Sequence, residues 1–270
     1  MGGFEPVSGE WSQAMLYHSP LTYSQLTNYN RIMKSEIHFL APPGPCGYLP
    51  DQTWRLEYEF FSKLSAAEYL NRMENGWRRF GASVFRPRCP ACNACRSLRV
   101  LVERFEPSRS QRRVRKANAA VITLRRGPPS VSRAKLDLYD RYHAFQAETK
   151  GWPWHEAKDM ASYANSFVEN PFPTEEWCYF LGDRLVGVGY VDVLPGALSA
   201  IYFFYDPDER GCSMGIWNVL NVIDRARELS IPYVYLGYYV EGCPSMEYKA
   251  GFRPNQIRGP DGGWRDFRTH

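Results

Sequence analysis

The order of apolar and polar positions predicts a mixed α and β fold. Before residue 128, alternating segments predict strands at 54–61, 82–86, 97–103 and 121–124. Ser65 and Glu68 have the spacing of a capping box and predict a helix over 65–76. Pro107 and Ser108 open a second predicted helix, which runs to about Ala120. This first part therefore reads as a small α+β unit.

The second part follows a Gly-Pro-Pro-Ser turn at residues 127–130. Aromatic and aliphatic residues at helical spacing predict a helix over 131–149. Three strands separated by short turns are expected at 176–181, 184–192 and 198–205, then a helix at 213–229. The apolar segment 233–238 predicts a buried strand in parallel pairing.

These elements define three expected regions. Residues 1–32 show no sustained period and are expected to be weakly ordered. Residues 33–127 form the smaller cysteine-bearing α+β domain, and residues 128–270 the larger domain. An antiparallel meander, a helix and a parallel strand follow one another in GNAT-type acyltransferases, whose last two strands splay apart. We therefore expect an α+β / α/β protein with a GNAT-like C-terminal domain.

Composition favours a cytoplasmic protein. The 270 residues carry a net charge of only +4, so the basic character is local. No apolar segment is long enough to cross a membrane, and the N-terminus lacks a signal-peptide core. We expect neither a membrane nor DNA as partner. In a reducing compartment, clustered cysteines are expected to bind a metal or react, not to form structural disulfides.

Four cysteines are candidate metal ligands. Cys89, Cys92 and Cys95 follow one another at two-residue gaps, and Cys46 precedes them in a Pro- and Gly-rich segment. Such spacing can direct several thiols to one metal, and the residues leave zinc and an iron–sulfur cluster both open. Packed thiols without a metal are the alternative.

The helix after this cluster is rich in arginine. Arg109, Arg112, Arg113 and Lys116 fall near one helical face, and acidic residues are scarce between 107 and 126. Such a face can follow a phosphate backbone, which predicts contact with nucleic acid. A solvated charged face is the alternative.

Several motifs stand in one order along the chain: Cys46-Gly-Tyr-Leu-Pro50, Gly76-Trp-Arg-Arg-Phe-Gly81, Pro107-Ser-Arg-Ser-Gln-Arg-Arg113 and the segment from Leu236 to Lys249. Together they resemble the aminoacyl-tRNA–protein transferase family, and the cysteine spacing resembles its bacterial leucyl branch. The resemblance implies transfer of an amino acid from charged tRNA to a protein that begins with Asp or Glu, which marks it for degradation. Leucine is the expected residue and arginine the next.

Within this resemblance the reaction centre is expected on the last strands. Asp206 and Glu241 are candidates to take the proton of the acceptor amine, and Tyr238 lies between them on the strand. Lys249 and Arg253 are candidates to bind the acidic acceptor, while Tyr202 and Tyr205 can contact substrate. Turn carboxylates and surface charge are the structural alternatives. An activated ester needs no cofactor for transfer.

Two other functions stay open on sequence alone. A GNAT-fold acetyltransferase would use acetyl-CoA, but two acids and irregular glycine spacing in Asp208-Glu-Arg-Gly-Cys-Ser-Met-Gly215 disfavour a pyrophosphate there. A non-catalytic tRNA-binding protein would need only the basic helix.

Overall fold

A large mixed sheet forms the centre of the molecule in this computed structural model, which describes residues 37–61, 63–152 and 154–267. Its strand order is β14-β13-β7-β12-β11-β10-β9-β8. Its strands are β7 (Arg96–Leu101), β8 (Ile122–Gly127), β9 (Thr174–Leu181), β10 (Arg184–Leu194), β11 (Ala197–Tyr205), β12 (Tyr233–Tyr239), β13 (Asn255–Arg258) and β14 (Trp264–Asp266). The expected mixed α and β class is confirmed.

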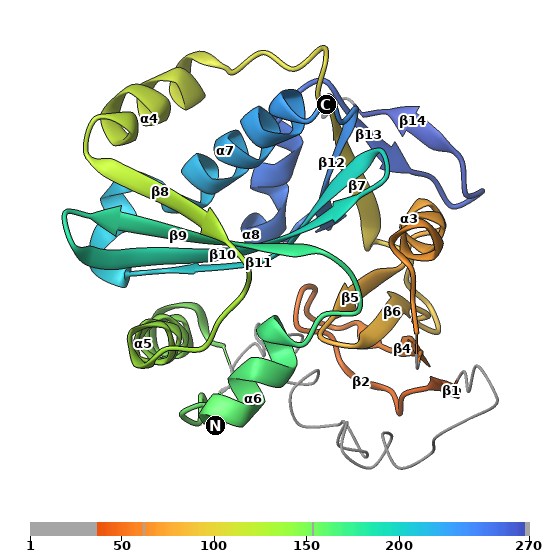
Figure 1. Ribbon diagram of the computed structural model, residues 1–270. Helices are drawn as coiled ribbons and strands as arrows, with labels where there is room; N and C mark the ends of the chain where they lie inside the picture. Colours follow the sequence, from red (N-terminus) through yellow and green to blue (C-terminus); the bar gives the residue numbers. More distant parts are fainter. Residues whose placement is uncertain (1–36, 62, 153, 268–270) are drawn as a thin grey trace.

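One face of this sheet is covered by α7 (Met214–Glu228) and α4 (Arg109–Ala119), as Figure 1 shows. The buried side of α7 packs on β-strand residues such as Val186 and Leu198 in one apolar core. On α4, Asn118 donates to Cys212 O and Arg115 pairs with Asp224 of α7. The basic helix is therefore fixed on the α7 side of the sheet.

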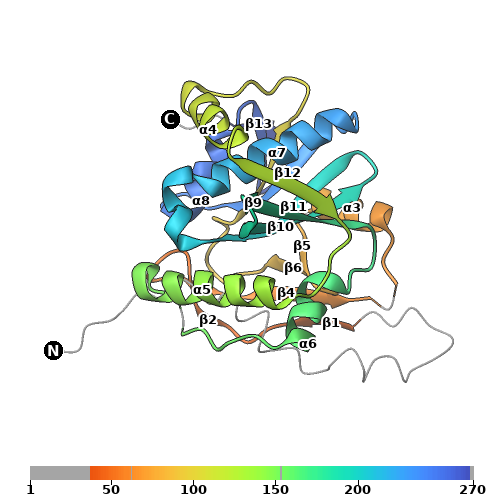
Figure 2. The same ribbon diagram turned by 60° about the vertical axis from the view of Figure 1, so that its left-hand side comes forward.

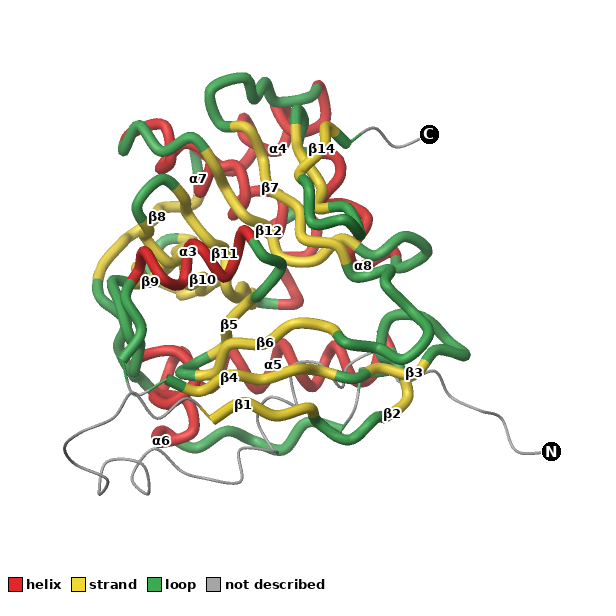
Figure 3. Tube along the Cα trace, turned by 90° about the vertical axis from the view of Figure 1, so that its right-hand side faces the viewer, coloured by secondary structure: helices red, strands yellow, loops and turns green. Residues whose placement is uncertain are grey.

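The opposite face carries a second, four-stranded sheet of order β1-β4-β6-β5 (Figure 3). Its strands are β1 (Ile37–Leu40), β4 (Leu56–Phe60), β5 (Arg78–Phe80) and β6 (Ser83–Pro87), with the short pair β2 (Gly44–Pro45) and β3 (Thr53–Trp54) beside it. The helices on this side are α3 (Ala66–Glu74), α5 (Arg133–Lys150), α6 (Met160–Tyr163) and the π-helix η1 (Ala164–Val168). Figure 2 shows α5 and the small sheet on this same side.

After β11 the chain forms the 3-10 helix η2 (Pro207–Cys212), and after β12 it forms α8 (Pro244–Glu247) and η3 (Tyr248–Gly251). Both predicted helix starts are confirmed: the one from the capping box at Ser65, and the one from Pro107 and Ser108. The strands β1, β5, β13 and β14 were not predicted. Residues 1–32, expected to be weakly ordered, lie outside the described residues. Within the described part, each helix is too short or too polar to cross a bilayer.

The predicted boundary at residue 127 does not separate the two sheets. Strands β7 and β8 precede it, yet both belong to the large sheet with the strands that follow it. β7 pairs with β12 on one side and β13 on the other, and β8 pairs with β9. The small sheet alone is built entirely from residues before the boundary.

Candidate functional site

The strands β11 and β12 separate near the middle of the large sheet. They pair in parallel for three residues, ending at Ser199 and Tyr235. Beyond that point β11 stays with β10, while β12 follows β7 across a register break between Tyr235 and Tyr238. Gly237 lies in this break with a φ of 82°, a left-handed conformation that favours glycine. The opening, which we call the splay, leaves peptide groups of both strands to bond other partners.

The side chain of Arg78 enters the splay from β5 of the small sheet. Its guanidinium donates to Ser199 Oγ at 3.1 Å and to the carbonyl oxygen of Ala200 at 2.7 Å. A Cβ built on Gly237 would lie 3.6 Å from the Arg78 nitrogens. Arg78 thus bonds β11 and lies close to Gly237 of β12, where the hydrogen bonds between these strands stop.

Arg78 is a buried cation without an acidic partner. It is 6% exposed, and no described carboxylate forms an ion pair with it. The next residue, Arg79, is equally buried but is paired with Asp192, with Nε to Oδ2 at 2.8 Å. A buried charge is costly unless it is compensated. The contrast within one strand singles out Arg78 as a group suited to meet an anion or a developing negative charge.

Lys249 is the second cation at the splay. Its ammonium donates to Tyr238 O at 2.8 Å and contacts Met246 Sδ at 2.9 Å, and no described carboxylate pairs with it. Burial lowers the pKa of Lys249 to about 7, and repulsion from Arg78 adds to the effect. Since Arg78 affects this pKa, the two cations share one electrostatic environment.

The three predicted catalytic residues are not brought together. Tyr238 points from β12 toward the small sheet, where its hydroxyl donates to Gly76 O at 2.9 Å. The Glu241 side chain is 79% exposed just after β12 and lies 3.7 Å from Arg96. Tyr238 therefore joins the two sheets, and Glu241 alone has an unrestrained carboxylate near the end of β12.

Asp206 has a structural environment. It is buried after β11, where its side chain accepts from Asp208 N and caps η2. Arg141 and Arg184 both bind its carboxylate, with Nη2 to Oδ1 at 2.7 Å and Nη1 to Oδ2 at 2.5 Å. Two guanidinium partners occupy its oxygens, so this geometry favours the turn-carboxylate alternative over a general base.

The predicted substrate-binding residues fall into two groups. Tyr202 of β11 bonds His143 Nε2 at 2.9 Å, and the ring of Tyr205 lies 5.3 Å from that of Tyr142 of α5 in a tilted arrangement. Lys249 lies in η3, and Arg253 follows it, with Nε donating to Ala250 O. Only the second group lies on the β12 side of the splay.

The predicted tRNA-binding residues Arg109, Arg112, Arg113 and Lys116 are all exposed on α4. None of them forms an ion pair with a described residue. At the first turn of the helix, Gln111 donates to Gly251 O in η3 at 3.1 Å. The structure therefore brings the start of the basic helix against the segment that carries Lys249.

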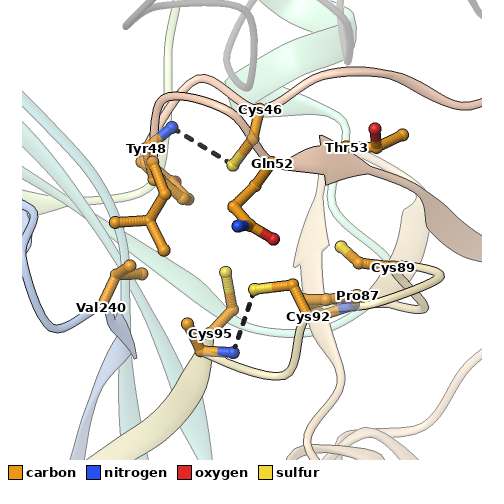
Figure 4. A pocket seen from close by; sticks show the side chains of 11 residues that line it. Cys46, Tyr48, Gln52, Thr53, Pro87, Cys89, Cys92, Cys95 and Val240 are labelled. Atoms are coloured by element: carbon orange, nitrogen blue, oxygen red, sulfur yellow. Dashed lines mark hydrogen bonds between the residues drawn. The ribbon is translucent and has the colours of Figure 1, made fainter.

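The four candidate metal ligands line one small pocket beneath the small sheet, with a volume of about 10 Å³. Figure 4 shows Cys46, Cys92 and Cys95 around the same space, and Cys89 farther to its side. Within the described residues, no three His, Cys, Asp or Glu side chains lie close enough together to hold a metal ion. Thiolates suit zinc and iron–sulfur clusters, but this arrangement does not converge on one point, so ligation stays a prediction.

Burial raises the pKa of Cys95, and the neighbouring thiols raise it further. The pKa of Cys89 is raised as well, chiefly by burial. As the pocket stands, these two side chains are neutral thiols.

Sequence reasoning missed Arg78 as a site residue, although it lies inside the quoted motif from Gly76 to Gly81. The available signal was two consecutive arginines between Trp77 and Phe80, an unusual place for charge. Sequence reasoning also missed the contacts of the histidines. His155 bonds Asp140 at 2.7 Å, and the His155 ring lies 4.8 Å from that of His143.

Family models and curated relatives both match this chain, and they agree on one family of transferases. Models described as "Arginine-tRNA-protein transferase, N terminus" and "Arginine-tRNA-protein transferase, C terminus" match residues 44–113 and 134–259. A protein of Campylobacter jejuni named aspartate/glutamate leucyltransferase is 38% identical over 82% of this chain and 92% of its own length. A protein of the same name from Pseudomonas aeruginosa is 36% identical over 81% and 92%.

Solved structures show weaker likeness. The C-terminal domain of a putative lysylphosphatidylglycerol synthetase from Agrobacterium fabrum gives a TM-score of 0.44 at 11% identity, covering 62% of this chain and 61% of that one. FemX gives a TM-score of 0.42 at 9% identity, covering 77% and 80%.

Proposed function

The chain belongs to the arginine-tRNA-protein transferase family, and from this premise we propose that it transfers leucine from charged tRNA to proteins that begin with Asp or Glu. Members of this family are aminoacyltransferases. The name of the relatives, aspartate/glutamate leucyltransferase, supports leucine over arginine as the residue transferred. Because charged tRNA is made and used in the cytoplasm, we place the reaction there.

The reaction needs positioning and charge stabilisation rather than a covalent nucleophile. The acceptor's neutral amine attacks the ester carbonyl carbon of the aminoacyl-tRNA, forming the C–N bond. The C–O bond to the terminal ribose then breaks, and the ribose hydroxyl recovers a proton while the amine loses one. A free α-amine has a pKa of about 7.7–8.0, so a useful fraction is neutral at cellular pH.

We propose the splay as the place of this reaction, within a GNAT-like arrangement of β8 to β12. The observation that carries the assignment is Arg78, a buried cation without an acidic partner at the point where β11 and β12 separate. A fixed positive charge beside the ester carbonyl stabilises the oxyanion that develops on attack. Peptide groups released by the splay add donors for the same atom.

The structure supports the other candidate site residues to different degrees. Glu241 stays the candidate acceptor of the amine proton, since its carboxylate is exposed and only weakly paired. Lys249, with Arg253 after it, stays a candidate to bind substrate on the β12 side. Nothing favours acetyl-CoA: in the segment before α7, Glu209 pairs with Arg184 and Asp208 with Arg141, so two carboxylates lie where a pyrophosphate would bind.

The test is a transfer assay with the purified full-length protein. It combines leucyl-tRNA or arginyl-tRNA with a peptide that begins with Asp, and product is measured by mass. We expect leucine transfer. If neither amino acid is transferred while tRNA still binds, the protein is an RNA-binding protein and the proposed function is wrong.

Variants at Arg78 then test the site. Arg78→Met should lower kcat by about 10²-fold or more, as removal of one oxyanion donor does in other enzymes, and Arg78→Lys should restore part of it. The KM for leucyl-tRNA should change little. Arg79→Met is the structural control, because breaking a buried ion pair costs about 3–5 kcal/mol of stability. Unchanged kcat in a folded Arg78→Met protein would exclude Arg78 from the reaction centre.

A further inference from the structure

A groove lined by four arginines lies between the two sheets. It has a volume of about 280 Å³ and is bounded by the end of α3, by β6, by the start of β7 and by the end of β13. Its arginines are Arg86, Arg88, Arg96 and Arg258. Tyr238 also lines it, and β12 carries this residue directly past the splay. The groove therefore ends at the strand that borders the proposed reaction centre.

Positive charge exceeds negative charge in this groove. Glu57 lies behind it and binds both Arg86 and Arg88, at 2.5 and 2.8 Å. Arg96 has only the exposed Glu241 at 3.7 Å. Arg258 donates to a backbone oxygen, Glu74 O, and forms no ion pair with a described residue.

The arginines are also held in place before any ligand binds. The Arg86 guanidinium lies 4.4 Å from the centre of the Trp77 ring while Glu57 binds its Nε. Arg258 Nε is fixed to the end of α3. A planar guanidinium fixed at one nitrogen keeps the opposite edge for a carboxylate, so the groove is organised for anion recognition.

A second observation points to a ligand. Ser97 lines the groove and is 3% exposed, yet its Oγ has no hydrogen-bond partner in the described structure. A buried hydroxyl without a partner is costly, and an acceptor oxygen in the groove would remove that cost. An anionic oxygen would satisfy this hydroxyl and the arginines together.

The position of the groove decides between the two substrates. Helix α4, which carries the exposed cations, lies on the α7 side of the large sheet (Figures 1 and 3), whereas the residues that line the groove include Arg86 and Pro87 of the small sheet. Because Gln111 of α4 bonds Gly251 O in η3, we infer that RNA held by α4 would reach the splay from the α7 side. The groove, lined in part by the small sheet on the other side of the large sheet, is then left to the acceptor protein. The volume of the groove suits one or two amino-acid residues and not an RNA helix.

We propose that this groove binds the carboxylate of the acceptor's N-terminal Asp or Glu, with Arg258 and Arg86 as specificity-determining residues. This inference rests on the proposed function for the identity of the acceptor. It places recognition of the acidic side chain in the groove, and leaves Lys249 to the splay.

Equilibrium binding tests the proposal without requiring turnover. A fluorescent peptide beginning with Asp and its Asn counterpart are titrated with the full-length protein, and affinity is read by anisotropy. The wild type should prefer the Asp peptide. Arg258→Gln should weaken Asp-peptide binding at least about tenfold, the loss expected for one charged hydrogen bond, and leave the Asn peptide nearly unchanged.

Arg265→Gln is the matched control. Arg265 lies on the same hairpin as Arg258 but is exposed, binds Asp261 and does not line the groove, so peptide affinity should stay at the wild-type value. Ser97→Ala should weaken the Asp peptide without loss of thermal stability, since its hydroxyl bonds nothing in the described structure.

The outcomes separate the two claims. If Arg258→Gln keeps the Asp preference but weakens leucyl-tRNA binding and lowers its salt dependence, the groove holds RNA phosphate and the proposal is wrong. Equal binding of Asp and Asn peptides by the wild type also overturns it. If the wild type binds the Asp peptide selectively but transfers no amino acid, the groove assignment stands and the proposed function fails.

Discussion

At the scale of single residues, a buried polar chain lies beneath β11. Asp140 bonds His155, the His155 ring packs against that of His143, and His143 bonds the Tyr202 hydroxyl. His143 is 2% exposed. Burial lowers its pKa to about 3, and repulsion from His155 and Lys158 contributes. His143 is therefore neutral in the folded protein at every pH above that value.

This depressed pKa predicts a pH dependence of stability. In the unfolded chain a histidine titrates near 6.5, so between pH 6.5 and 3 the unfolded state binds the proton and the folded state does not. Stability should fall as pH falls through this window. From pH 7 to pH 5, His143 alone should remove about 2 kcal/mol of unfolding free energy.

The measurement is urea unfolding at pH 7 and pH 5 for the wild type and for His143→Gln. The variant keeps an amide that can bond Tyr202 but cannot titrate. Its loss of stability between the two pH values should be smaller by about that amount. The groups that face His143, namely Tyr139, Tyr142, His155, Lys158 and Tyr202, are unchanged, so equal losses in both proteins would contradict the assignment.

Arg78 and Arg79 show where sequence reasoning stops at this scale. Both follow Trp77 in one short motif, and nothing local distinguishes them. Their roles depend on partners more than a hundred residues away: Asp192 for Arg79, and Ser199 with Ala200 for Arg78. Only the packed sheets show that Arg79 has an acidic partner and that Arg78 has none among the described residues.

At the scale of elements, α4 combines a defined start with an unpaired cationic face. Ser108 and Gln111 form both bonds of its capping box, at 3.3 and 2.8 Å. Arg109, Arg112 and Arg113 lie in its first half and form no ion pairs with described residues. The cap fixes the helix, and the exposed arginines are left to solvent or RNA.

Removing these charges should change the salt dependence of tRNA binding. Each phosphate contact contributes about 0.7–0.9 to the slope of log affinity against log salt. The triple variant Arg109→Gln, Arg112→Gln, Arg113→Gln should therefore lower the slope by about 2–3, measured by filter binding over a range of salt concentrations.

An exposed arginine far from α4 is the control for this change in salt dependence. Arg133 is exposed at the start of α5, on the other face of the sheet, and pairs with Asp137. Arg133→Gln should leave the slope unchanged. A triple α4 variant with a wild-type slope would mean that α4 is only a solvated face.

Elements with local signals were predictable, and those made by tertiary pairing were not. A capping box gave the start of α3, Pro107 and Ser108 gave the start of α4, and alternation with short turns gave β9, β10 and β11. In contrast, β5 has only three residues and β13 only four. Such short strands exist because a neighbouring strand supplies their hydrogen bonds, which no local pattern records.

At the scale of the whole molecule, the two sheets share one chain in an interleaved way. The large sheet places β7 between the much later strands β12 and β13, and β8 at its edge beside β9, although both come from residues up to 127. Arg78 and Tyr238 then join the small sheet to the splay by hydrogen bonds. The reaction centre and the arginine groove therefore depend on both halves of the chain.

This interleaving predicts that residues 128–270 do not fold alone. Without β7 the strands β12 and β13 lose their common partner, and without β8 the edge of β9 is exposed. The isolated fragment should show no cooperative thermal transition by circular dichroism, whereas the full-length chain should show one. A sharp transition in the fragment would contradict the prediction.

Strand β7 has one more consequence, for synthesis on the ribosome. Both of its neighbours, β12 and β13, leave the exit tunnel more than 120 residues after it. During that interval the nascent chain carries an apolar strand with two unsatisfied edges, a state prone to misassociation. The proposed reaction centre can close only after β12 and β13 have emerged, so we expect newly made chains to depend on chaperones throughout that interval.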